Sequence, residues 1–144
     1  MPDSPVFLDS NIIIYAYSST DPKKASVCRK AIASGNVVIS AQVINEFVSV
    51  AHKKFHHPFA SIEAAVRELL PFVHVASLSA ETSLLAIRLA EKFNLSWYDS
   101  LIIASAIENG CSLLFSEDMQ HGMVMEGLTI INPFKTAEVL NAES

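Results

Sequence analysis

Four acidic positions border apolar runs of the sequence, and their carboxylates are the side chains best suited to chemistry. Asp9 interrupts the stretch FLDSNIIIYAY, and Asp118, with Glu117 before it, follows the apolar run SLLF. Glu46 follows the run VVIS, and Asp99 precedes the run LIIASAI. The set contains no cysteine or histidine, so oxygen is the only ligand atom that it offers.

Carboxylates of this kind would suit a divalent cation if folding brought them together. Two carboxylates about 4 Å apart repel by about 4 kcal/mol at a surface-like effective dielectric, so a positive charge or protonation must offset them. Ligands that are all oxygen favour Mg²⁺ or Mn²⁺, which accept a few carboxylates and keep several waters. Such ions polarise a phosphoryl oxygen and activate water. Metal-assisted chemistry on a phosphate ester is therefore one hypothesis.

Each acid also has an ordinary structural interpretation. Asp9, Ser10 or Asn11 can cap a following helix, and Ser96 and Asp99 have the spacing of a capping box. A solvated position on a helix or a turn would explain the remaining acids. The apolar residues after Asp99 predict that it is buried on most sides. The sequence leaves both interpretations open for each acid taken alone.

The elements that would position these acids alternate between strands and helices. Short apolar runs predict strands of a covered parallel sheet at Val6–Leu8, 37–39, 72–75, 112–115 and Leu128–Ile131. Helical patterns occupy residues 12–17, 22–33, 41–55, 62–70, 80–93 and 97–108. This alternation predicts an α/β fold. Because crossovers are right-handed, the carboxyl ends of all strands, and the acids near them, would share one edge of the sheet.

Composition sets limits on the class of protein. The chain has 144 residues, of which 51% are hydrophobic, and no repeat or linker, so one domain over residues 1–144 is expected. Cys28 and Cys111 lack metal-site spacing, which favours reduced thiols in a cytoplasmic protein. We expect no secretory leader and no membrane span. The net charge of −5 requires local basic residues or bound cations for any polyanionic partner.

The densest basic stretch is HKKFHH at residues 52–57. Lys53 and Lys54 could guide a nucleic-acid backbone toward Glu46 on the same helix, although basic residues also favour helix C-termini. His121, three residues after Asp118, is a further candidate for substrate contact. The aromatic pair at 97–98 is expected to pack at the start of its helix, with base stacking as the alternative.

Three segments together resemble the PIN-domain ribonucleases, and most closely the VapC-like toxins of bacterial and archaeal toxin–antitoxin pairs. They are VFLDSNIIIYAY, SAQVINEFVSVAHKKF and SWYDSLIIASAIENGCSLLFSEDMQHGMVMEGLTIINPF. The third segment is the longest and most specific. The resemblance covers residues 6–134, although residues 55–93 match only as a helical pattern.

The resemblance assigns roles to particular residues. It implies that Asp9, Glu46 and Asp99 form an acidic triad that binds Mg²⁺ or Mn²⁺, with Asp118 at a fourth acidic position. Asn11 would steady the first aspartate, Ser116 would add a supporting hydroxyl, and Glu117 adds a carboxylate where many members have a neutral residue. Whether Glu117 or Asp118 faces the metal is left open.

The resemblance also implies an architecture, an activity and partners. The fold would be a three-layer α/β/α sandwich around a central parallel sheet of four or five strands. The activity would be metal-dependent hydrolysis of RNA that leaves a 5′-phosphate and a 3′-hydroxyl. Asp9, Asp99 and Asp118 would hold one or two ions, while Glu46 completes the shell or orients the attacking water. Homodimerisation and a small antitoxin that covers the acidic groove are the implied protein contacts.

Other classes of protein remain as alternatives. A receiver-like regulatory domain would need a lysine directly after the last strand, where this chain has NPF. A haloacid-dehalogenase-like phosphatase would need Asp-x-Asp after the first strand, where this chain has DSN. A PIN-like module that binds RNA or a partner without cleaving, and a housekeeping nuclease rather than a toxin, both fit the sequence.

Overall fold

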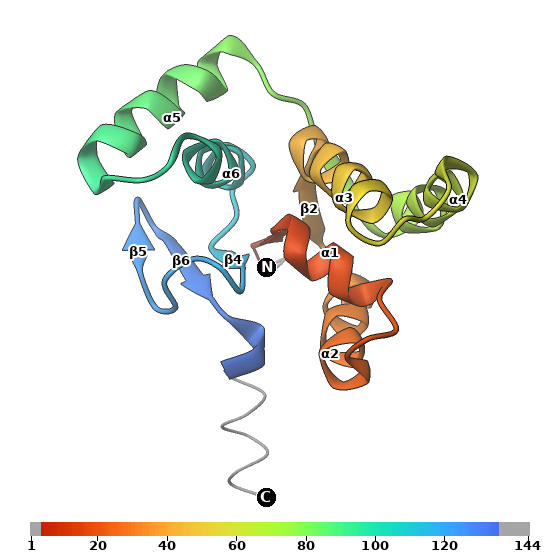
Figure 1. Cartoon of the computed structure of the whole chain (residues 1–144). Coiled ribbons are helices and arrows are strands. Elements are labelled where there is room, and N and C mark those ends of the chain that lie inside the picture. Colours follow the sequence, from red (N-terminus) through yellow and green to blue (C-terminus); the bar gives the residue numbers. More distant parts are fainter. Residues whose placement is uncertain (1–3, 136–144) are drawn as a thin grey trace, which may run out of the picture.

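Six short strands form one sheet at the centre of the molecule (Figure 1). A computed structural model describes residues 4–135 of the chain. The strands are β1 (Val6–Leu8), β2 (Val37–Ser40), β3 (His74–Ala76), β4 (Leu113–Phe115), β5 (Val124–Met125) and β6 (Leu128–Ile131). Their order is β3-β2-β1-β4-β6-β5, and all neighbours are parallel except β5 and β6. Strand β1, which leads to Asp9, is therefore paired on both sides.

Helices connect the strands, and small polar residues begin most of them. They are α1 (Ser10–Ala16), α2 (Pro22–Ala33), α3 (Ala41–Lys53), α4 (Phe59–Leu69), the 3₁₀-helix η1 (Leu70–Phe72), α5 (Ala80–Phe93) and α6 (Trp97–Glu108). Ser40 and Ser96 accept hydrogen bonds from the first turns of α3 and α6, a cap worth about 1 kcal/mol each. The caps place the start of both helices at the carboxyl edge of the sheet.

The helices form two groups on opposite sides of the strands (Figure 1). The chain moves from β1 outward to β2 and β3 through α1–α4, then returns across the sheet through α5 and α6 to β4. Because each crossover is right-handed, reversing the direction of travel puts the later helices on the other face. This arrangement is the α/β/α sandwich that the resemblance implies, although the sheet has six strands rather than four or five, and β5 is antiparallel.

The core is continuous across the sheet and includes one wholly buried helix segment. Residues 100–106 of α6 are all buried, as expected for a helix that is apolar on every side. Cys28 and Cys111 are free thiols, both buried. Within residues 4–135, no helix combines the length and the apolar character that crossing a bilayer requires.

The predicted fold class is confirmed, with small differences in its elements. Strand β3 begins two residues later than expected because Pro71 lies in η1. Helix α4 begins three residues earlier, directly after Pro58. The two-residue strand β5 was not predicted. Its hairpin turns at Glu126 and Gly127, both with positive φ (51° and 83°), which is a type I′ turn. The predicted domain also includes residues 1–3 and 136–144, which lie outside the described residues.

Candidate active site

Asp9 lies at the carboxyl end of the central strand, and its carboxylate is buried and held from two sides. The Ser10 backbone N–H donates to Oδ1 at 2.7 Å, and the Ser116 hydroxyl donates to Oδ2 at 2.8 Å. Asp9 also caps α1, so its predicted structural role and its place among the acids are both realised. Only 6% of the residue is exposed.

Burial raises the pKa of Asp9 from 3.8 to about 6. The hydrogen bonds from Ser116 and Ser10 act in the opposite direction, while the negative charges of Glu46 and Asp118 raise the pKa further. A carboxyl whose charge is destabilised by two neighbouring carboxylates is a group that a cation would stabilise.

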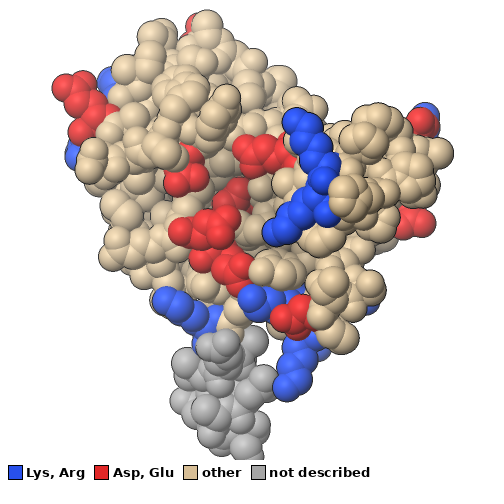
Figure 2. Space-filling model, viewed as in Figure 1, with Lys and Arg blue, Asp and Glu red and all other residues tan. Residues whose placement is uncertain are grey.

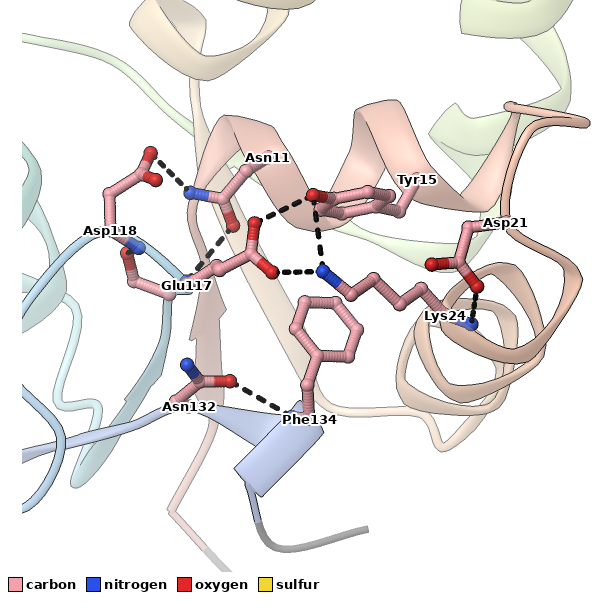
Figure 3. A network of polar contacts seen from close by, with 9 residues as sticks. Asn11, Tyr15, Asp21, Lys24, Glu117, Asp118, Asn132 and Phe134 are labelled. Atoms are coloured by element: carbon pink, nitrogen blue, oxygen red, sulfur yellow. Dashed lines mark hydrogen bonds and ion pairs between the residues drawn. The ribbon is translucent and has the colours of Figure 1, made fainter. Parts of the chain in front are cut away.

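Asn11 and Ser116 connect Asp9 to Asp118, and Figure 3 shows the bond from Asn11 to Asp118. The Asn11 amide Nδ2 donates to Asp118 Oδ2 at 3.0 Å and, at a longer 3.4 Å, to Asp9 Oδ2. The Ser116 hydroxyl accepts from the Asp118 backbone N–H at 3.3 Å. One amide and one hydroxyl thus fix two acids that are distant in sequence.

Glu46 is joined to the same cluster through α1. The Ser10 hydroxyl donates to Glu46 Oε2 at 2.7 Å, and Gln42 Nε2 donates to Oε1 at 2.7 Å. The glutamate is half-buried, so the interpretation of a fully solvated helix residue is wrong. Sequence reasoning assigned no part in the cluster to Ser10 or Gln42. The Ser10 contact joins α1 to α3 over 36 residues and has no local signal, whereas Gln42 and Glu46 lie four residues apart on one face of α3.

Asp99 lies in the first turn of α6, and Gln42 connects α3 to this turn by donating to the Tyr98 carbonyl at 3.4 Å. The Asp99 backbone N–H donates to Ser96 Oγ at 3.3 Å. Within residues 4–135 the Asp99 carboxylate accepts no hydrogen bond from the Ser96 backbone N–H, so the capping box is incomplete. Asp99 is half-buried rather than buried on most sides. Trp97 and Tyr98 are 42% and 67% exposed, so the expectation that they pack into the protein is wrong.

The Glu117 side chain points toward Tyr15 and Lys24, away from Asp118 (Figure 3). Its carboxylate accepts from Lys24 Nζ at 2.5 Å and from the Tyr15 hydroxyl at 2.6 Å. Burial raises the pKa of Glu117, but the Lys24 and Tyr15 contacts outweigh burial and hold the pKa below its usual value. Asp118 is therefore the member of the pair that lies beside Asp9. No pattern in the sequence indicates which of the two acids lies there.

The acidic side chains gather around a hollow (Figure 2), but within residues 4–135 no three Asp, Glu, His or Cys side chains stand close enough to hold one ion directly. Ser10 and Asn11 lie between the carboxylates. The donor chemistry nevertheless fits a hard cation, since all donors are oxygens and Mg²⁺ uses one or two carboxylates plus waters. Gln42 Oε1 is also buried, with no partner among the described residues.

The basic stretch lies at the end of α3, and Lys or Arg side chains border the acidic hollow on the α3 side (Figure 2). Lys53 and Lys54 are exposed, and Lys54 Nζ lies 5.6 Å from the centre of the Phe55 ring. His52 stacks on Phe59 with ring centres 3.9 Å apart. Cationic and aromatic side chains are thus present together at this border.

His121 has a contact within the fold. Its Nδ1 accepts from the Asn132 backbone N–H at 2.9 Å, which ties the loop after Asp118 to the end of β6. The side chain is exposed, and its role in substrate contact stays a prediction.

Comparison with known protein families gives one match. A model of the PIN domain matches residues 6–122. No curated protein matches the sequence.

Solved structures with a similar fold include toxins and toxin–antitoxin complexes. The sarcin–ricin-loop-cleaving toxin VapC20 of Mycobacterium tuberculosis has 19% identity and a TM-score of 0.64, over 78% of this chain and 91% of that chain. A toxin–antitoxin complex from Klebsiella pneumoniae has 21% identity and a TM-score of 0.67, over 90% and 98%. VapBC2 from Rickettsia felis, bound to a promoter DNA fragment, has 19% identity and a TM-score of 0.62, over 87% and 96%. At these identities the similarity is one of fold.

Proposed function

Because the chain belongs to the PIN-domain family, we propose that it is a divalent-metal-dependent ribonuclease and the toxin of a toxin–antitoxin pair. The observation that carries this proposal is the gathering of Asp9, Glu46 and Asp118 at the carboxyl edge of the sheet. Ligands bind at this edge in open α/β folds. The similarity in fold to VapC20 and to toxin–antitoxin complexes supports the choice of RNA as substrate.

The residues divide into metal ligands and residues that position them. Asp9, Asp99 and Asp118 would hold Mg²⁺ or Mn²⁺, with Glu46 completing the shell or orienting the attacking water. A bound divalent ion supplies charge neutralisation at the scissile phosphate and activates water. Ser116 and Asn11 keep Asp9 and Asp118 in place through the hydrogen bonds described above.

Basic residues at the rim would bind the substrate backbone. Lys53 follows Glu46 by seven residues on α3, which places it within about 20° of the same helix face and about 10 Å farther along the axis. A lysine there can contact a phosphate next to the scissile one. Lys54 and His121 are further candidates for substrate contact.

The expected partners follow from the proposed role. A small antitoxin would cover the acidic groove, and toxin–antitoxin complexes are among the similar structures. We also expect a homodimer, and RNA as substrate implies action in the cytoplasm. A neighbouring reading frame for a short DNA-binding protein with a basic tail would support the toxin role over a housekeeping nuclease.

The direct test is cleavage of single-stranded RNA with Mg²⁺, with EDTA, and by the Asp9→Asn and Asp99→Asn variants. We expect cleavage in Mg²⁺ only, and a loss of more than about 100-fold in both variants. Glu91→Gln, which changes an exposed acid on α5, serves as the matched control and should cleave normally. Unchanged cleavage by Asp9→Asn and Asp99→Asn would exclude this site.

A non-catalytic PIN-like module is the second candidate, and one observation favours it. The carboxylates are separated by Ser10 and Asn11, so a site for direct ligation by three of them is not preformed. A binding module would bind RNA without cleaving it, and its affinity for Mn²⁺ would be unchanged in Asp9→Asn. Titration with Mn²⁺ separates the two candidates.

A further inference from the structure

Two adjacent acids, Glu117 and Asp118, follow β4, and their side chains lie on different sides of Asn11 (Figure 3). Asn11 Oδ1 accepts from the Glu117 backbone N–H at 3.2 Å, while Asn11 Nδ2 donates to Asp118. This pair of bonds fixes the backbone between the two acids. It does not by itself decide which carboxylate faces Asp9.

Lys24 and Tyr15 bind the Glu117 carboxylate on the side away from the cluster. Lys24 Nζ contacts Oε2, and the Tyr15 hydroxyl donates to Oε1. The Lys24 and Glu117 side chains are only 31% and 26% exposed, so this ion pair is better shielded than a surface pair. The charge of the Glu117 carboxylate is thus balanced by the Lys24 ammonium and is not added to the cluster.

Aromatic rings keep Lys24 in this position. Its Nζ lies 4.8 Å from the centre of the Tyr15 ring and 4.9 Å from that of Phe134. The two rings meet edge to face at 5.2 Å, a geometry that aromatic pairs favour. Cation–π contacts on two rings restrict the lysine to one side of the loop.

We propose that Lys24, held by Tyr15 and Phe134, is a positioning residue that keeps the Glu117 carboxylate out of the acidic cluster, so that Asp118 alone of the pair faces Asp9. This inference rests on the proposed metal-dependent function. The parts of this latch, which we define as Tyr15, Lys24 and Phe134 around Glu117, come from the consecutive helices α1 and α2 and from the C-terminal side of β6.

Release of Glu117 would affect metal binding and catalysis in opposite directions. An added carboxylate near the cluster attracts the ion more strongly. The same carboxylate repels the substrate phosphate and lowers the charge that the ion can offer to it. A purely structural loss, in which the loop becomes disordered, would instead weaken both metal binding and cleavage.

The experiment compares the full-length Lys24→Met, Glu117→Gln and double variants. Lys24→Met keeps an unbranched apolar side chain and removes the charge. We expect Lys24→Met to bind Mn²⁺ at least about threefold tighter by calorimetry, and to cleave RNA about tenfold more slowly. Glu117→Gln alone should change little, because the latch already holds this carboxylate away. The double variant should return both values to near wild type.

Lys92→Met and Glu126→Gln are the matched control, since this ion pair at 2.8 Å is more exposed and joins α5 to the turn between β5 and β6. The proposed role of Lys24 would be contradicted if Lys24→Met behaved like Lys92→Met. It would also be contradicted if the double variant cleaved RNA as slowly as Lys24→Met. Weaker Mn²⁺ binding by Lys24→Met would also overturn it. A wild-type protein that neither binds Mn²⁺ nor cleaves RNA would contradict the proposed function itself.

Discussion

At the scale of single residues, Asp9 is under opposing influences. The hydrogen bonds from Ser10 and Ser116 favour its charged form, whereas burial and the charges of Glu46 and Asp118 disfavour it. The raised pKa shows that burial and repulsion dominate. A residue with this balance stabilises the fold least when it is ionised and without a cation.

The first prediction is a loss of stability as the pH rises from about 4 to about 6 in EDTA. The pKa of Asp9 is about 6 in the fold and 3.8 ordinarily, so in this range the folded state binds more protons than the unfolded state. The stability present below pH 4 is lost as the pH passes 6, by about 3 kcal/mol. Urea unfolding between pH 4 and 7.5 measures it. The Asp9→Asn variant should lack this component, and an equal slope in both proteins would contradict the account.

Asn11 gives the second prediction at this scale. Asn11→Ala removes the donor to Asp118 and the acceptor for the Glu117 N–H, so we expect kcat to fall about 10- to 100-fold. The unfolding midpoint should change little, because the side chain is only half-buried. Asn45→Ala, at an exposed position of α3, is the control. Normal kcat in Asn11→Ala would show that Asp118 does not need this amide.

At the scale of elements, α3 carries an acid and a base on one polar face. Glu46 faces the cluster, and Lys53 lies two turns farther along. The helix therefore connects the proposed reaction centre to the residue that is proposed to contact the substrate backbone.

The third prediction concerns this face of α3. Lys53→Ala should raise KM for RNA about fivefold to tenfold without changing kcat, because the contact is made before and during the reaction. The slope of log affinity against log salt should decrease by about 0.7, the value for one phosphate of a single strand. Lys30→Ala, an exposed lysine on α2, should change neither quantity. A change in kcat alone would place Lys53 elsewhere in the mechanism.

The elements themselves were largely predictable, whereas their contacts were not. Apolar runs located β1, β2, β4 and β6 because covered parallel strands have no polar face. Strand β5 was missed because two residues are too few for a pattern, although the Glu126–Gly127 turn was a usable signal.

Acids at strand and helix ends are visible in the sequence, and the structure brings Asp9, Glu46 and Asp118 together. The metal-binding role of these three acids and of Asp99 stays a prediction. The resemblance implied Asn11 and Ser116 as supporting residues, and both contact Asp9. The contacts of Ser10 with Glu46 and of Lys24 with Glu117 were not predicted, because they join residues that are distant in sequence. Ser10 and Glu46 are 36 residues apart, and Lys24 and Glu117 are 93 apart. No local spacing indicates such a pair, so the choice of Asp118 over Glu117 needed the structure.

At the scale of the whole molecule, a chain with net charge −5 is proposed to bind a polyanion. The acidic hollow would repel RNA unless cations were bound there. Metal binding is therefore expected to alter the stability of the whole protein, and not only the reaction.

The fourth prediction is that Mn²⁺ stabilises the protein at pH 7.5. At a concentration of about 100 times Kd the gain is about 2.7 kcal/mol, which corresponds to a rise in Tm of about 5–10 °C for a domain of this size. Differential scanning calorimetry with Mn²⁺ and with EDTA measures it. The rise should be much smaller in Asp9→Asn and unchanged in Glu91→Gln. Equal rises in wild type and Asp9→Asn would mean that the ion binds outside the cluster.

The position of β1 between β2 and β4 has a consequence during translation. Asp9 is synthesised before the strand that completes its surroundings, which follows more than a hundred residues later, since Ser116 is 107 positions away. A growing chain that ends before β4 cannot form the complete acidic hollow. The proposed cleavage activity would therefore be absent from the nascent polypeptide until β4 has been made.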